Sequence, residues 1–452
     1  MDTIAAIATG ASVAAIGIVR LSGDGAIPAV KKVFFPLSGG DVEKMQDRKL
    51  VYGELKTLSG DLLDLCLCTV SRGPNSYTGE DTAELQCHGS PMVLRTLLEE
   101  LFRLGVRQAL PGEFTKRAFL NGKLELTSAE AVADLIDAET QEAVRNAAGQ
   151  LSGAISRKTD SIYSNLTDIC AHYHAVLDYP DEDIEDFRIA AYRDTLAGAK
   201  AELARLLRGF DRGKMMNSGI PAAIIGKPNA GKSSLLNALL GYDRAIVTAI
   251  PGTTRDTIEE KLKIGNVLLR LTDTAGIRDA QDEAERIGVE RSYGALSSAR
   301  LVILVIDGTE ALTPTDCQLL ACAEKAEKAI VAVSKQDVSG FSSAEVKTTL
   351  PVIEFSSVTG EGLDALEKEI AQMFPVPDVP AGEILTNARQ AEAVSAAIEY
   401  LTAAEEALAC GSTPDIVLTE VEGAMHAIGE LSGKTVREDV TNRIFARFCV
   451  GK

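Results

Sequence analysis

The sequence predicts a multidomain protein of the α/β + α class: an N-terminal α+β domain, a helical bundle, and an α/β domain with a mainly parallel sheet inserted into that bundle. Three observations predict this fold. Residues 1 to about 120 mix strand-like and helix-like patterns. Helical patterns occupy residues 121–212 and return at about 382–452. Between them, from about 215 to 376, apolar strands alternate with helices, as in parallel βαβ units.

The length and composition indicate a large globular protein. At 452 residues the chain is long enough for about three domains. Hydrophobic residues make up 46% and charged residues 25%, so a sizeable core can be buried. No apolar run approaches the roughly 20 residues that span a bilayer, and no basic segment precedes an apolar one at the N-terminus. We therefore expect a soluble, cytoplasmic protein without a membrane contact.

Cysteine usage and charge narrow the function classes further. The cysteines are scattered, as expected for reduced thiols, and Cys66 and Cys68 would share a strand face without further metal ligands. The net charge is −19. Because a protein that grips RNA by itself would carry a basic face, any basic patch must be local or supplied by a partner.

Local patterns predict individual elements in the first half of the chain. Strands are expected at Ile16–Leu21 and Leu62–Val70, and a helix at Ser90–Leu104. Thr127-Ser128-Ala129-Glu130 reads as a capping box that starts a helix. Helical patterns continue through Leu151–Leu177, where His172 and His174 would point to different faces, and through Tyr192–Leu207. The acidic run 178–186 is expected to be a solvated connection.

A GxxxxGKS segment at 226–233 predicts a phosphate-binding loop. It follows the apolar run 222–225 and precedes a helix-forming segment at 234–240. Glycines let backbone N–H groups turn onto phosphate oxygens, and the helix N-terminus adds a positive dipole end. Lys232 can reach the β- and γ-phosphates and the Ser233 hydroxyl can coordinate Mg²⁺. The expected phosphate contacts are Asn229, Ala230, Gly231, Lys232, Ser233 and Ser234.

Further nucleotide motifs follow in order. A mobile loop offers a threonine for Mg²⁺, and a DTAG motif after the strand 267–271 offers an aspartate for Mg²⁺ and a glycine N–H for the γ-phosphate. The residues concerned are Pro251, Gly252, Thr253, Thr254, Asp273, Thr274, Ala275 and Gly276. The apolar runs Leu301–Ile306 and Ile330–Val333 are typical of parallel strands buried on both faces.

The base-binding motifs favour guanine. Lys335 and Asp337 follow the strand at 330–333, and Ser356, Ser357 and Val358 follow the next strand. The Asp337 carboxylate can accept from guanine N1–H and N2–H, which adenine lacks. Five motifs in order at strand ends predict a GTPase domain rather than an ATP-using one.

Two positions depart from the usual pattern. Ile277 stands where GTPases of the Ras type carry a water-orienting glutamine, so an acid in 282–286 must do that work. Ser334 stands where the base motif normally begins with asparagine, so we expect one contact to the base or to a loop to be weaker.

The segments that flank the GTPase motifs resemble one family. They are Pro74 to Asp81 (PNSYTGED), Glu84 to Gly89 (ELQCHG), Pro111 to Phe114 with Arg117 to Lys123 (PGEF, RAFLNGK), and the terminal Phe448 to Lys452 (FCVGK). Together they are similar to the tRNA modification GTPase MnmE (TrmE) family over essentially the whole chain.

The resemblance implies a domain organisation. It implies an N-terminal tetrahydrofolate-binding and dimerisation domain at 1–120, the first part of a helical domain at 121–213, a Ras-like P-loop GTPase domain at 214–377, and the second helical part at 378–452. Arg20, Glu84, Lys123 and Lys452 match the folate contacts of the family. Glu285 matches its water-orienting acid, and Lys232 shares the catalytic role. Mg²⁺ would be held by Ser233 and Thr254, and K⁺ by Asn229, Thr248, Ile250 and Thr253. Thr248, Ala249 and Ile250 would also contact GTP.

The resemblance also implies an activity and partners. With the FAD protein MnmG, a homodimer of this chain would add (carboxymethyl)aminomethyl groups to C5 of the wobble uridine of certain tRNAs. The one-carbon unit would come from a tetrahydrofolate derivative (5,10-methylene or 5-formyl), and K⁺ would drive dimerisation of the GTPase domains. FAD, and most of the tRNA contact, would come through the partner in a heterotetramer or larger assembly. The alternative is a regulatory GTPase that assists assembly of the ribosome or another RNA, which folate binding would distinguish.

Overall fold

The computed structural model describes residues 2–10, 12–178, 189–241, 260–271, 299–340, 342–343, 346–375, 379–433, 438–446 and 448–451. They fall into two compact units. The first lies within Met1–Ala133, Leu151–Thr195 and Tyr400–Lys452, and the second within Asp134–Gln150 and Leu196–Glu399. Each unit is described by itself below.

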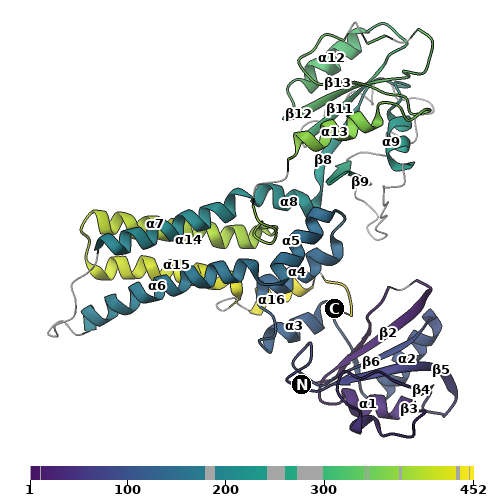
Figure 1. Ribbon diagram of the computed structural model, residues 1–452, viewed down its shortest axis with the longest axis vertical. Helices are drawn as coiled ribbons and strands as arrows, with labels where there is room; N and C mark the ends of the chain where they lie inside the picture. Colours follow the sequence, from purple (N-terminus) through teal and green to yellow (C-terminus); the bar gives the residue numbers. More distant parts are fainter. Residues whose placement is uncertain are drawn as a thin grey trace. The chain divides into compact units, whose positions relative to one another are not determined.

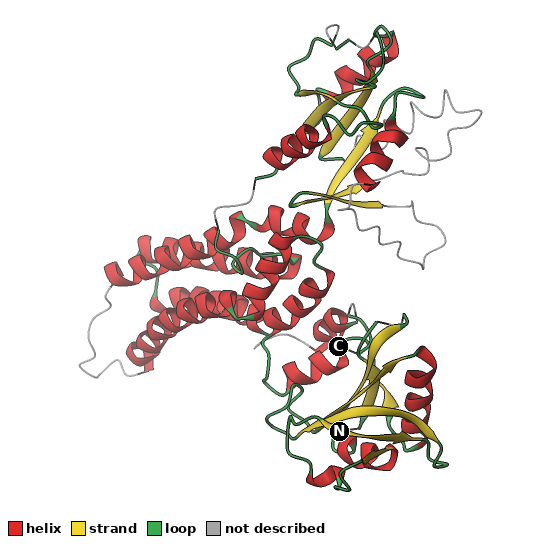
Figure 2. Cartoon of the chain, turned by 45° about the vertical axis from the view of Figure 1, so that its right-hand side comes forward, coloured by secondary structure: helices red, strands yellow, loops and turns green. Residues whose placement is uncertain are grey.

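The first unit contains a seven-stranded sheet (Figure 2). Its strands are β1 (Ile4–Ile7), β2 (Ala14–Ser22), β3 (Phe34–Pro36), β4 (Val51–Lys56), β5 (Leu62–Ser71), β6 (Thr82–Gly89) and β7 (Arg107–Gln108). The order is β3-β4-β5-β6-β2-β1-β7, and all neighbours are antiparallel except β1 and β7. The strands predicted at Ile16–Leu21 and Leu62–Val70 are confirmed.

Two helices cover one face of this sheet. They are α1 (Ala26–Val33) and α2 (Pro91–Arg103), the latter confirming the helix predicted there. Alternation along β5 places Cys66 and Cys68 in this core, on the shared face that the sequence indicated. The opposite face carries a cross-strand row of side chains that are exposed or half-buried. The row is Tyr52, Leu67, Gln86 and Ile18.

Helices that lie wholly or mainly in the first unit accompany this sheet. They are α3 (Glu113–Leu120), α4 (Leu126–Asp137), α6 (Ala154–Asp178), α15 (Pro414–Ser432) and α16 (Glu438–Phe445). Phe445 and Phe448 pack with Leu126 at the start of α4. Pro111 and Val450 form an antiparallel bridge. In Figure 1, α6 and α15 run side by side, so helices from both ends of the helical region pack together as predicted.

The capping-box prediction was wrong about where α4 begins. The helix starts at Leu126, and Ala129 N already donates to the carbonyl of Glu125. Leu126 is fully buried, so its packing starts the helix two residues before Ser128, the first helical residue that the polar pattern indicated. Thr127 therefore lies inside the helix, where its hydroxyl is 3.2 Å from that of Ser156.

The two histidines of α6 have different neighbours, as their spacing predicted. His172 hydrogen-bonds the hydroxyl of Tyr192 on α7 (Ile189–Arg208), whereas His174 lies 3.0 Å from the Glu422 carboxylate on α15. The i, i+2 spacing turns the two side chains apart. They therefore do not form a joint site.

The second unit contains a six-stranded sheet in the order β13-β12-β11-β8-β10-β9. Its strands are β8 (Ile220–Ile225), β9 (Glu260–Ile264), β10 (Val267–Leu271), β11 (Leu301–Asp307), β12 (Lys328–Ser334) and β13 (Val352–Glu354). All neighbours are parallel except β9 and β10. The mainly parallel sheet is therefore confirmed.

Helices cover both faces of this sheet. Along β11, alternate residues such as Ile303 pack with Leu235 of α9 (Lys232–Gly241) and Leu366 of α13 (Leu363–Met373). The residues between them, such as Val302, pack with Leu319 of α12 (Pro314–Ala323). This double burial explains why the strands are continuously apolar.

The segment 382–385, which follows the second sheet and α13 in the chain, is closely packed. Asn146 of α5 (Gln141–Leu151) donates to the Ile384 carbonyl at 3.0 Å and accepts from the N–H groups of Gly382 and Ile384. A Cβ on Gly213 of α8 (Phe210–Ser218) would lie 2.0 Å from the Leu385 carbonyl oxygen, so glycine is required there. The helix α14 (Ala388–Ala409) follows. None of the helices in the described ranges is long and apolar enough to cross a membrane.

Candidate functional site

The GxxxxGKS segment forms a loop between β8 and α9, as predicted. β8 ends at Ile225 and α9 begins at Lys232. Gly226 has a φ of 152°, and a Cβ there would lie 2.4 Å from the carbonyl oxygen of Val305 on the neighbouring strand. Gly231 has a φ of 99°. Glycine is required at both positions because the backbone is left-handed or passes too close to β11 for a side chain.

Residues 227–230 form a turn within this loop. Ala230 N donates to the Lys227 carbonyl at 3.3 Å, Pro228 takes the second position, and Asn229 has a φ of 60°. Proline at the second position and asparagine with positive φ at the third are the signature of a type II turn. The turn leaves the Asn229 side chain exposed. It is therefore accessible to a ligand.

Lys232 lies over the loop. Its Nζ donates to the carbonyls of Gly226 at 2.8 Å and of Lys227 at 2.6 Å. Burial holds the pKa of Lys232 below its ordinary value because the charged amine loses water. A bound phosphate would supply the missing counter-charge. Ser233 and Ser234 follow in the first turn of α9, where a hydroxyl oxygen is a ligand type that suits Mg²⁺.

The base motif contacts the phosphate loop through Ser334. Its hydroxyl donates to the Ala230 carbonyl at 2.7 Å, and both residues are buried. We expected the replacement of asparagine to weaken a contact to the base or to a loop. The structure shows that serine makes a contact to the phosphate loop, while its effect on the base contact stays a prediction.

The other base residues lie at the same edge of the sheet. Lys335, with a φ of 66°, pairs with Asp307 at the end of β11, and although burial opposes it, this pairing lowers the pKa of the Asp307 carboxyl. Asp337 is exposed. Ser356 accepts from the N–H groups of Val358 at 3.2 Å and Thr359 at 3.1 Å. Because β8, β12 and β13 run in the same direction, the loops that follow them meet at one edge, as predicted.

Several predicted site residues lie outside the described ranges. They are Thr248, Ala249, Ile250, Pro251, Gly252, Thr253, Thr254, Asp273, Thr274, Ala275, Gly276, Glu285 and Lys452. Their roles stay predictions.

In the first unit, Arg20 and Glu84 are cross-strand neighbours on β2 and β6. Arg20 Nε lies 2.8 Å from Glu84 Oε1, and its guanidinium lies over the rings of Tyr77 and Phe114 at 5.7 and 5.8 Å. Aromatic faces favour a cation placed at this distance. The arrangement combines a carboxylate, a guanidinium and two rings on the face of the sheet opposite α1 and α2.

Lys123 lies beside the loop that carries Tyr77. A Cβ on Gly79 of that loop would lie 3.2 Å from Lys123 Cε, and the Lys123 side chain is exposed. Lys123 also lines a cavity of about 710 Å³. The cavity residues are Lys116, Phe119, Leu120, Gly122, Lys123, Leu124, Glu125, Ser432, Gly433 and Thr441. The structure thus brings Arg20 and Glu84 into contact and places Lys123 against the loop that carries Tyr77, the residue whose ring lies under the Arg20 guanidinium.

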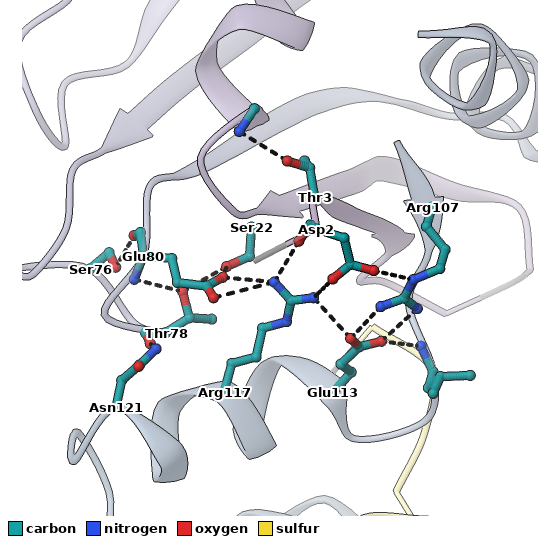
Figure 3. A network of polar contacts seen from close by, with 12 residues as sticks. Asp2, Thr3, Ser22, Ser76, Thr78, Glu80, Arg107, Glu113, Arg117 and Asn121 are labelled. Atoms are coloured by element: carbon teal, nitrogen blue, oxygen red, sulfur yellow. Dashed lines mark hydrogen bonds and ion pairs between the residues drawn. The ribbon is translucent and has the colours of Figure 1, made fainter. Parts of the chain in front are cut away.

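An ion-pair network holds that loop, and sequence reasoning missed it (Figure 3). Arg117 of α3, 4% exposed, donates to the Asp2 carbonyl and carboxylate, to Glu80 and to Glu113. Glu80 also accepts from the hydroxyl of Ser22 at 2.7 Å. The i, i+4 spacing of Glu113 and Arg117 was a signal in the sequence, but it could not show that Asp2 and Glu80 join them.

The network lowers the pKa of two of its carboxylates, Asp2 and Glu113. Arg107 holds the pKa of Asp2 below its ordinary value chiefly by hydrogen bonding. Burial alone would raise the pKa of Glu113, but hydrogen bonds from Arg107, the Leu110 N–H and Arg117 keep it lowered. Asp2 and Glu113 therefore stay charged at neutral pH and hold Arg117, which pairs with Glu80 of the loop that carries Tyr77.

Comparison with known proteins identifies the family. The model of the MnmE helical domain matches residues 126–449, and that of the GTP-binding protein TrmE N-terminus matches residues 3–123. The tRNA modification GTPase MnmE of Symbiobacterium thermophilum is 42% identical, with 100% of this chain and 99% of that protein covered. The proteins of the same name from Chloroflexus aurantiacus and Alkaliphilus metalliredigens are 40% and 39% identical, with 100% of this chain and 100% and 99% of those proteins covered.

Among solved structures, the G domain of the T. maritima FeoB iron transporter is 28% identical and covers 34% of this chain and 97% of its own. The TM-score of this match is 0.24. The sequence relatives and the family models, which together span the chain, agree with the phosphate loop and the base motif described above. The chain belongs to the MnmE family of tRNA modification GTPases, and it is a GTPase.

Proposed function

We propose that this chain hydrolyses GTP to drive the addition of a (carboxymethyl)aminomethyl group to C5 of the wobble uridine of certain tRNAs. The one-carbon unit comes from 5,10-methylenetetrahydrofolate. The FAD protein MnmG is the proposed partner and supplies the FAD and most of the tRNA contact, which suits the net charge of −19 of this chain. One observation carries the proposal beyond a plain GTPase: a second candidate site, built around Arg20 and Glu84, in the same chain.

The chemistry of that second site supports a folate ligand. The pterin ring presents N–H donors along one edge, and Glu84 supplies carboxylate oxygens that accept them. Tyr77 and Phe114 supply flat apolar surfaces beside Arg20. We propose that Lys123, which is exposed beside the same loop, pairs with a carboxylate of the folate glutamate. Lys452 is the fourth proposed contact.

For GTP hydrolysis we propose two cations and one acid. Ser233 and Thr254 hold Mg²⁺, and Asn229 holds K⁺ together with Thr248, Ile250 and Thr253. When bound, K⁺ offsets charge that develops between the β- and γ-phosphates. Within the described part of the loop, the exposed side chain of Asn229, whose backbone has a left-handed conformation, supports the assignment of this residue to K⁺. Lys232 binds the phosphates and Glu285 orients the attacking water.

We also propose that the chain forms a homodimer through the face of the seven-stranded sheet that lies opposite α1 and α2. In addition, the GTPase domains associate in a K⁺-dependent manner. Tyr52, Ile16 and Leu65 on that face are 50%, 59% and 39% exposed. Apolar side chains gathered on one sheet face favour burial against a second protein surface. The proposed domains are 1–120, 121–213, 214–377 and 378–452.

Folate binding tests the proposal against the alternative of a regulatory GTPase in RNA or ribosome assembly. We expect 5-formyltetrahydrofolate to bind the wild type in isothermal titration calorimetry, and Lys123→Ala to abolish binding. Lys116→Ala is the matched control, because this lysine of α3 is bound to Asn442 Oδ1 at 2.6 Å. A wild type that binds no folate would favour the regulatory alternative.

The proposed K⁺ site has its own test. GTP hydrolysis is measured in KCl and in NaCl at equal ionic strength for the wild type and for Asn229→Gly. Glycine removes the side chain while tolerating the φ of 60°, whereas alanine would also strain the turn. We expect K⁺ to activate the wild type strongly and the variant little. Equal rates of the wild type in both salts would exclude the K⁺ mechanism.

A further inference from the structure

The phosphate loop is anchored at Lys227, a residue that no motif assigns a function. Lys227 Nζ lies 2.9 Å from Asp316 Oδ2 in the first turn of α12, and 3.6 Å from Glu310. The exposed fraction is 15% for the Lys227 side chain and 1% for that of Asp316. The hydrogen bond to Asp316 raises the pKa of Lys227. The pair is therefore a charged contact that is largely shielded from water.

Asp316 cannot easily lose this partner. Its Oδ2 accepts from the Thr313 N–H at 2.9 Å and hydroxyl at 2.7 Å, which caps α12. Its Oδ1 is buried and has no hydrogen-bond partner among the described residues. A buried carboxylate without a neighbouring cation is strongly unfavourable. Lys227 supplies that cation, so the carboxylate holds the phosphate loop against α12.

A second anchor lies on the other side of the turn. Ser334 donates to the Ala230 carbonyl, so the residues held from outside the loop, Lys227 and Ala230, bracket Asn229. Asn229 is the left-handed residue of the turn, with a φ of 60°. Asparagine adopts this conformation more readily than other non-glycine residues, but it still costs free energy, which contacts from the surroundings offset. The two anchors are contacts of this kind.

The anchor at Lys227 also reaches the phosphate-binding lysine. The Lys227 carbonyl accepts from Lys232 Nζ at 2.6 Å and from Ala230 N at 3.3 Å. The side chain that pairs with Asp316 and the carbonyl that holds Lys232 thus belong to one residue. Fixing the side chain limits the movement of that carbonyl.

We propose that Lys227 and Asp316 are positioning residues for nucleotide binding. They act through the loop backbone, by keeping its N–H groups and Lys232 arranged for a phosphate before the nucleotide arrives. A site arranged in advance binds more tightly because less ordering is left to occur on binding. The inference concerns nucleotide binding alone, so it goes beyond the proposed tRNA chemistry and does not depend on K⁺, folate or a partner.

Lys227→Ala in the full-length chain tests this inference. We expect its Kd for a fluorescent GDP analogue, and its KM for GTP, to rise at least tenfold, which corresponds to about 1.4 kcal/mol. The kcat at saturating GTP should change much less, because bound nucleotide itself orders the loop. Lys227→Arg keeps a cation near Asp316 and should restore most of the affinity. Glu310→Gln removes the more distant, exposed carboxylate and should leave the affinity unchanged.

A matched variant separates positioning from simple destabilisation of α12. Thr313→Val removes the hydroxyl of the cap and leaves the Lys227–Asp316 pair in place. If Thr313→Val weakens GDP binding as much as Lys227→Ala does, helix stability explains the effect and the proposal is wrong. An unchanged Kd in Lys227→Ala, or a loss that Lys227→Arg does not restore, would also overturn it.

Discussion

The two sheets of this protein carry their candidate sites in different ways. The six-stranded sheet is mainly parallel, is covered on both faces, and presents its site residues in loops at one edge. The seven-stranded sheet is mainly antiparallel, is covered by α1 and α2 on one face, and presents Arg20 and Glu84 on the other. In the first sheet, the backbone of a contiguous loop forms the site. In the second, side chains on different strands form it.

This difference decides how well each candidate site can be predicted from the sequence. A loop that wraps a phosphate needs glycines and a lysine at fixed spacing. All of these residues lie within 226–233, so a local sequence motif predicts the loop. A site on a sheet face needs only that two strands pair in the correct register. Arg20 and Glu84 are 64 positions apart, and neither is distinctive by itself. Four predictions test how independent the two regions are.

The largest expected effect is that of Lys232→Ala on the nucleotide site. We expect kcat/KM for GTP hydrolysis to fall by at least about 100-fold, because a preorganised cation at the phosphates is lost. Phosphate release measures this effect. Binding of 5-formyltetrahydrofolate should stay as in the wild type, and a parallel loss of folate affinity would show that the two regions are not independent.

Arg117→Met should affect only the seven-stranded sheet and its surroundings. It leaves three carboxylates around a buried position, so we expect this region to lose about 3–5 kcal/mol of stability. Hydrogen exchange of β2 and β6 measures the loss. Arg107→Met is the control, since this side chain is 41% exposed and should matter less. Loss of GTP hydrolysis with unchanged exchange in β2 and β6 would contradict the prediction.

Asp337→Ala should change the preference for the base rather than the binding of phosphates. The lost hydrogen bonds to a charged acceptor should weaken GTP binding by about 1.5–3 kcal/mol. Competition of GTP and ATP against a fluorescent GDP analogue measures it, and ATP should compete as weakly as with the wild type. If GTP and ATP weaken equally, Asp337 acts on the fold and not on the base.

Acid should weaken the N-terminal network by a smaller amount. The folded-state pKa of Glu113 lies below its ordinary value of 4.5, so its stabilising contribution is complete above about pH 4.5 and is lost as the pH falls through the folded value. Thermal melting between pH 6 and pH 3, followed by circular dichroism, should show a steeper decline for the wild type than for Glu113→Gln. Identical slopes would exclude Glu113 as a source of acid sensitivity.

Sequence reasoning predicted the elements well where a local pattern decides them. The continuously apolar runs became β11 and β12, and the phosphate loop lies between β8 and α9 as expected. It was wrong about the start of α4, because the burial of Leu126 outweighed the polar capping pattern. It also missed the Arg117 network, whose members come from the N-terminus, a loop and a helix.

The sequence by itself determined the type of the main elements, the nucleotide loop and the family resemblance. These depend on neighbours within a few positions, through glycine conformations and hydrophobic periodicity. Only the tertiary structure decided which distant side chains meet. Ser334 and Ala230 are 104 positions apart, and Lys227 meets Asp316 only because β11 and α12 pack beside the loop. Such contacts are set by packing of whole elements, which no local pattern encodes.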